Sequence, residues 1–92
     1  MWFRAFIRGE NFLMEVNGKL SRYGFYTTRF VEASDSSGAE IAAVTAIKKD
    51  PKLWDTVRNP KNDSPMIYVE EIIPIDSSDS KAVAAGFTFY ES

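Results

Sequence analysis

The fold is decided by residues 11–20, which read Asn-Phe-Leu-Met-Glu-Val-Asn-Gly-Lys-Leu. The run of β-forming residues ends at Asn17-Gly18, and both of these residues tolerate the positive φ angles of a type I′ turn. The dipeptide therefore predicts a β-hairpin, with one strand over residues 11–16 and a long return strand over residues 19–33. Gly24 lies inside the return strand and indicates a bulge or a bend there.

The residues before this hairpin alternate with the two-residue period of a strand. Gly9-Glu10 is expected to form a tight turn between that strand and the next one. The first third of the chain would then be a three-stranded antiparallel meander. One face of the first strand would carry Phe3, Ala5 and Ile7, and the other face Trp2, Arg4, Phe6 and Arg8.

The segment after the hairpin predicts a helix over residues 38–49. Ser37 and Glu40 fit a capping box, in which the hydroxyl accepts a hydrogen bond from a first-turn amide and the carboxylate reaches back. Branched apolar residues recur at helical spacing and should pack on the sheet. They are Ile41, Val44 and Ile47, with alanines between them.

The last third of the chain alternates between turn signals and strand signals. Asp50-Pro51 predicts a short helical turn over residues 51–57, because proline suits the first helical position. A surface loop is expected over 58–65, a strand over 66–75, an exposed excursion over 76–85 and a final strand over 86–90.

The predicted fold class is α+β, with residues 1–92 forming a single domain. An antiparallel sheet of four to five strands, in β-β-β-α-β-β order, would have the main helix and the short helical turn on one face. Twelve of the thirteen aromatic residues fall in the expected strands and point to both faces, so one face stays uncovered. The expected core comprises Phe3, Ile7, Phe30, Val31, Ile41, Val44, Ile47, Leu53, Ile67, Val69, Phe87 and Phe89.

Composition excludes several classes of site. The 92 residues contain neither cysteine nor histidine, so disulfides and zinc sites built on sulfur or imidazole are impossible. A chain with 45% hydrophobic and 26% charged residues is expected to fold, and it has no signal-peptide core or membrane-spanning run. We expect a soluble, cytoplasmic protein without a cofactor, a metal or a catalytic residue.

Two polar segments have alternative interpretations. Glu70-Glu71 could supply a general base with a raised pKa, but an ion pair with Arg4, Arg8 or Arg29 across the sheet is the favoured interpretation. Adjacent strand residues point to opposite faces, so these two carboxylates should not act together. The cluster at residues 76–80 could hold Ca²⁺ or Mg²⁺, although its spacing is more typical of a polar linker.

A face rich in aromatic residues and arginines is the candidate binding surface. Protein–protein interfaces are enriched in these residue types, which predicts a non-enzymatic interaction module that forms a homodimer or binds another protein. The first alternative is a nucleic-acid-binding regulator, since residues 1–31 carry five basic against two acidic side chains. The second alternative is a small-molecule binding protein or an enzyme that uses a strand carboxylate. The candidate residues are Trp2, Arg4, Phe6, Arg29, Tyr68 and Tyr90. On the return strand, Tyr26 is the alternative to Arg29 as the residue that points to this face.

Overall fold

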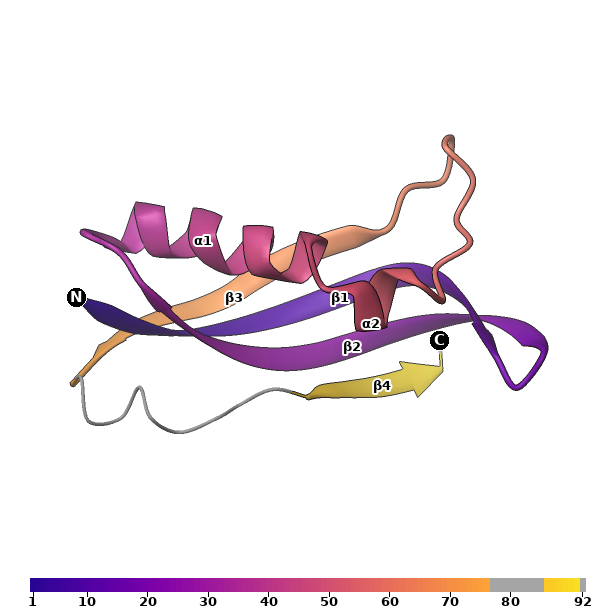
Figure 1. Ribbon diagram of the computed structural model, residues 1–92, viewed down its shortest axis with the longest axis horizontal. Coiled ribbons are helices and arrows are strands. Elements are labelled where there is room, and N and C mark those ends of the chain that lie inside the picture. Colours follow the sequence, from indigo (N-terminus) through magenta and orange to yellow (C-terminus); the bar gives the residue numbers. More distant parts are fainter. Residues whose placement is uncertain (77–85, 92) are drawn as a thin grey trace.

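A four-stranded antiparallel sheet with helices on one side forms the protein, which confirms the α+β class (Figure 1). The structure is a computed structural model that describes residues 1–76 and 86–91. The chain runs through β1 (Trp2–Val16), β2 (Lys19–Glu32), α1 (Ser36–Lys48), α2 (Pro51–Trp54), β3 (Met66–Ile75) and β4 (Phe87–Glu91). The strands lie side by side in the order β3-β1-β2-β4.

The hairpin at Asn17-Gly18 is confirmed. Asn17 and Gly18 have φ angles of 54° and 77°, the left-handed conformation that a type I′ turn requires at both positions. The two strands pair from Val16↔Lys19 back to Trp2↔Glu32. These long strands make the molecule elongated, with extents of 42 × 25 × 20 Å.

The turn expected at Gly9-Glu10 does not exist, because β1 continues through these residues as one strand. The pairing of β1 with β2 instead shifts between Gly9 and Phe12, where β1 contains a bulge. Asn11 takes up the irregular backbone with a φ of 60°, which asparagine tolerates better than most residues. The bulge lies opposite Gly24, but β1 carries the additional residue. The expected three-stranded meander is therefore a two-stranded hairpin.

Helix α1 packs on β1, β2 and β3 through small residues (Figure 1). Its fully buried side is formed by Ala39, Ala43 and Ile47. The expectation that Ile41, Val44 and Ile47 pack on the sheet was wrong in part, since Ile41 is 69% exposed and Val44 is only half-buried. Alanines allow the helix axis to approach the sheet closely, and the branched residues then fit better on the outward side.

An aspartate caps the N-terminus of each helix. The N-cap of α1 is Asp35, whose Oδ1 accepts a hydrogen bond from the Gly38 amide at 2.8 Å, so the capping box expected at Ser37 was wrong. Asp50 caps α2 as predicted, accepting from the Lys52 amide at 3.0 Å. Helix α2 ends at Trp54, whose indole Nε1 donates to the Ile47 carbonyl at 2.9 Å.

The core lies between the sheet and the helices. Of the residues expected there, Phe3, Ile7, Ile47 and Leu53 are buried, and Val31, Val44, Ile67, Val69 and Phe87 are partly buried. Three expectations were wrong: Ile41 and Phe89 are exposed, and Phe30 lies on the other face of the sheet opposite Arg4. The buried residues that sequence reasoning missed are Ala5, Phe12, Met14, Phe25, Ala39 and Ala43.

The strand aromatics divide evenly between the two faces. The helix-covered face holds Phe3, Phe12, Tyr23, Phe25, Phe87 and Phe89, while Trp2, Phe6, Tyr26, Phe30, Tyr68 and Tyr90 lie on the opposite face. Both helices lie on the same side of the sheet (Figure 1). No helix among residues 1–76 and 86–91 therefore covers the second set, and we call that side of the sheet the outer face.

Candidate interaction surface

Five of the six candidate residues lie on the outer face. Trp2, Arg4 and Phe6 come from β1, and Tyr68 and Tyr90 come from β3 and β4. Arg29 does not belong with them, because it pairs opposite Ala5 and therefore points to the helix-covered side. There its side chain is only 13% exposed and binds Asp50 at 3.3 Å. Its guanidinium also lies 4.9 Å from the ring centroid of Phe87.

Tyr26 takes the place that Arg29 was expected to share, and it completes a row of three rings. Its ring stacks on Phe6 at a centroid distance of 5.4 Å with an interplanar angle of 2°. The next ring is Tyr90, 5.5 Å from Tyr26 and tilted by 35°. Phe6, Tyr26 and Tyr90, which we call the aromatic row, thus connect the neighbouring strands β1, β2 and β4. Ring contacts of this kind add to the stability that is gained from burying the aromatic area.

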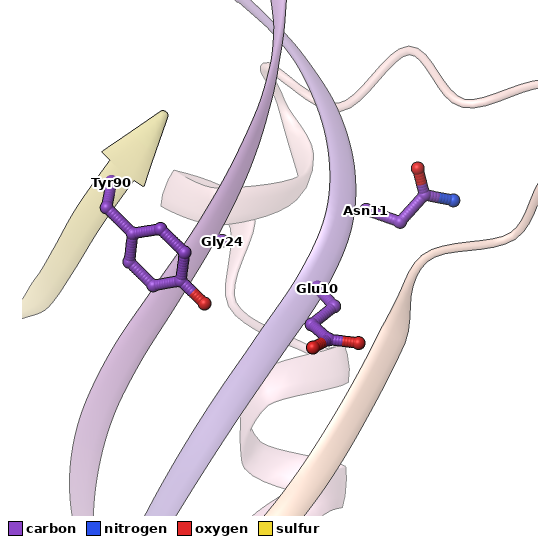
Figure 2. Close-up of a pocket in the computed structure, with 4 residues that line it drawn as sticks. All are labelled: Glu10, Asn11, Gly24 and Tyr90. Atoms are coloured by element: carbon purple, nitrogen blue, oxygen red, sulfur yellow. The ribbon is translucent and has the colours of Figure 1, made fainter. Parts of the chain in front are cut away.

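A glycine makes room for the end of the row. The ring of Tyr90 lies directly over Gly24, where a Cβ atom would stand 2.6 Å from Cε2 of the tyrosine. Gly24 therefore allows Tyr90 to lie flat against the sheet. Figure 2 shows the shallow hollow beside it, about 240 Å³ in volume, lined by Glu10, Asn11, Gly24 and Tyr90.

The arginines of the outer face are engaged by carboxylates of the same chain. Arg8 donates from Nε to Glu70 at 2.6 Å, also pairs with Glu10, and lies 4.5 Å from the ring centroid of Tyr68. The hydrogen bond to Glu70 raises the pKa of the Arg8 guanidinium. Arg4 lies 3.9 Å from Glu71. The favoured interpretation of Glu70-Glu71, an ion pair across the sheet, is confirmed.

A bulge explains why both glutamates lie on the same side, contrary to the sequence expectation. Phe6 pairs opposite Glu71 and Ile7 opposite Val69, so Glu70 is an additional residue in β3. Because of that extra residue, both side chains can reach arginines on the outer face. Both glutamates are exposed, and neither lines the hollow in Figure 2, so the geometry offers no support for a general base.

A second polar cluster, which the sequence did not reveal, fixes the loop before β3 to the bulge in β1. Asn11 donates to Asp63 at 2.8 Å, and Asn59 donates to the Asn11 carbonyl at 2.8 Å. Arg22 binds Asp63 at 2.9 Å. The pKa of the Asp63 carboxyl is lowered mainly by the hydrogen bond from Asn11 and then by the one from Arg22. The hydrogen bonds of Asn11 join positions about fifty residues apart in the sequence, so no local motif predicts the cluster.

The acidic cluster proposed for Ca²⁺ or Mg²⁺ falls, apart from Asp76, outside the described residues. Within residues 1–76 and 86–91, no helix is long and apolar enough to cross a bilayer. Comparisons with protein-family models, with curated proteins and with solved structures give no match to this chain.

Proposed function

We propose that this protein is a non-enzymatic interaction module that self-associates through its outer face. The observation that carries the proposal is the aromatic row, together with half-buried Trp2, Phe30 and Tyr68, on a face that no described helix covers. Exposed apolar side chains rimmed by polar residues are typical of a site of association.

The dimensions of the outer face suit a dimer. The four strands have 15, 14, 10 and 5 residues, and at ~3.4 Å per residue and ~4.8 Å between strands they would offer roughly 700 Å². Stable complexes bury roughly 600–1,000 Å² on each partner, and one such face on each of two copies falls within this range. A two-fold axis that lies in the plane between two such faces would place the aromatic row of one copy against the same row of the other.

The charges on this face favour a protein partner over a nucleic acid. Arg4 and Arg8 are already bound by Glu10, Glu70 and Glu71, which leaves one more acidic than basic side chain among these five. Phosphate binding needs cationic groups that can release counterions, and internally paired arginines supply them poorly. A second copy presents the same alternation of arginine and glutamate, so ion pairs can also form between copies.

Two neighbouring residues of β4 provide the test. Tyr90 and Phe89 are similarly exposed, at 37% and 41%, but they point to opposite faces of the sheet. Tyr90→Glu places a charge in the proposed interface, and Phe89→Glu makes the matched change on the other side. Sedimentation equilibrium from low micromolar to several hundred micromolar protein should show dimers or larger species for the parent chain and for Phe89→Glu. Tyr90→Glu should raise the dissociation constant about ten-fold or more, which corresponds to ~1.4 kcal/mol. Circular dichroism would verify that both variants fold. A parent chain that stays monomeric across this range would overturn the proposal.

A further inference from the structure

Helix α1 presents a second unpartnered surface, on the opposite side of the molecule from the outer face (Figure 1). Its outward residues line a shallow hollow of about 310 Å³. We call this set the α1 stripe, and it consists of Glu40, Ile41, Val44, Thr45 and Lys48. Ile41 is the most exposed of the large hydrophobic residues described, which makes the middle of the stripe apolar.

The apolar surface continues beyond the helix. A second groove of about 410 Å³ adjoins the stripe at Val44 and Lys48 and extends to the beginning of β3. Its apolar lining includes Trp54 and Met66, and Met66 is exposed. A partner seated on the α1 stripe could therefore bury side chains from two neighbouring elements.

The charges of the stripe are arranged to match a copy of themselves. Glu40 and Lys48 lie at its two ends, about 12 Å apart along a helix that rises 1.5 Å per residue, and Val44 lies midway between them. Neither charge takes part in an ion pair among the described residues. When two such helices pack antiparallel about a two-fold axis at Val44, each end meets the end of opposite charge.

From this pattern we propose that two copies of the chain pair through antiparallel α1 helices. Glu40 would bind Lys48 of the partner subunit, and Lys48 would bind Glu40 of the partner subunit. Ile41, Val44 and Thr45 would fill the space between the helices. The occupant is a second copy because the acidic end and the basic end complement each other only after a two-fold rotation. This pairing goes beyond the proposed function, since it uses a separate surface and would link outer-face dimers into larger assemblies.

Charge reversal provides the test. The symmetric contact contains the ion pair between Glu40 and Lys48 twice, so one substitution changes both copies of that pair. E40K turns both pairs into lysine–lysine contacts, and K48E turns both into glutamate–glutamate contacts. Exposed ion pairs are individually weak, so we expect each variant to associate about ten-fold more weakly than the parent at low salt. A 1:1 mixture of E40K and K48E should regain the parent affinity, because every lysine of one copy then faces a glutamate of the other.

The series is measured by sedimentation velocity in the parent chain and again in the Tyr90→Glu background, which separates this contact from the outer face. K49E changes the net charge as K48E does but lies at the helix C-cap outside the stripe, so it should associate like the parent. Raising the salt concentration should reduce the difference between the single variants and their mixture. Equal association of the parent, E40K and K48E, or a mixture no stronger than either variant alone, would overturn the proposed pairing. The outer-face proposal would be unaffected by that result.

Discussion

Replacing Gly9 by alanine should destabilise the protein by about 1–3 kcal/mol, the usual cost of inserting atoms into a packed core. A Cβ atom at Gly9 would lie 2.5 Å from Cζ and 2.6 Å from Cδ2 of Phe25. The Phe25 ring is fully buried, with Phe12 and Phe87 each 5.0 Å from it and Phe89 at 5.8 Å. The ring cannot move aside by the ångström that the new methyl group needs without displacing its neighbours.

Urea unfolding followed by tryptophan fluorescence measures this cost, because Trp54 packs 5.7 Å from Phe12 in the same core. Gly86→Ala is the matched control, since no atom lies within 4 Å of a Cβ at that position. We expect a change within about 0.5 kcal/mol for the control, as for other open surface sites.

A double-mutant cycle tests the stated mechanism more sharply. Phe25→Leu removes the ring atoms that oppose Gly9, so the combined variant should be more stable than the sum of the two single effects by at least ~0.5 kcal/mol. Strictly additive effects, or a Gly9→Ala variant as stable as the parent, would refute the close packing of Phe25 on Gly9 as the cause.

Three further predictions concern the turn, the helix cap and the response to acid. Gly18→Ala should cost about 1–2 kcal/mol in thermal unfolding, because Gly18 has a φ of 77°. Asp35→Ala should cost about 1 kcal/mol, whereas Ser37→Ala should be nearly neutral by the same measurement; the reverse ranking would show that the cap is misassigned. Asp63 has a lowered pKa because of its hydrogen bond from Asn11, so its carboxylate form is favoured by folding. Its contribution to stability is present above the ordinary pKa of 3.8 and is lost as the pH falls through the lower folded-state value. The stability difference between the parent and Asp63→Asn should therefore shrink in acid urea titrations, and a constant difference would contradict the assignment.

The elements that the sequence predicted correctly have local causes. Asn17-Gly18 forces the hairpin through its backbone preferences, and Asp50-Pro51 begins α2 for the same kind of reason. Gly9-Glu10 misled the prediction, because a glycine before a polar residue looks like a turn. Its actual role is to accommodate the ring of Phe25, a residue sixteen positions away. Such a contact between two strands is not visible in local composition.

The inward side of α1 was predicted correctly at Ile47 but not at the other positions, because hydrophobicity and available space favour different residues. Ile41 and Val44 are the more apolar candidates, but the sheet allows only alanines at Ala39 and Ala43. The distance between helix and sheet is set by the tertiary structure, and the sequence of the helix alone does not contain it. That failure is informative, since the misplaced residues form the α1 stripe.

The candidate site was predictable wherever strand alternation was uninterrupted. Trp2, Arg4 and Phe6 fall on one face by the two-residue period, and the pairing confirms this. Tyr26 and Arg29 are three positions apart, so at most one of them could share that face. Which one does so depends on the register between β1 and β2, to which the bulge at Gly9/Phe12 contributes.

The bulge at Glu70 also makes β3 a poor template for the addition of another strand. Strand β3 lies at a free edge of the sheet, where unpaired amides and carbonyls invite another strand to add. An additional residue, two adjacent carboxylates and Pro74 interrupt that edge and make regular extension of the sheet costly. Growth by strand addition is thereby discouraged at β3, which favours contacts through side chains over contacts through backbones.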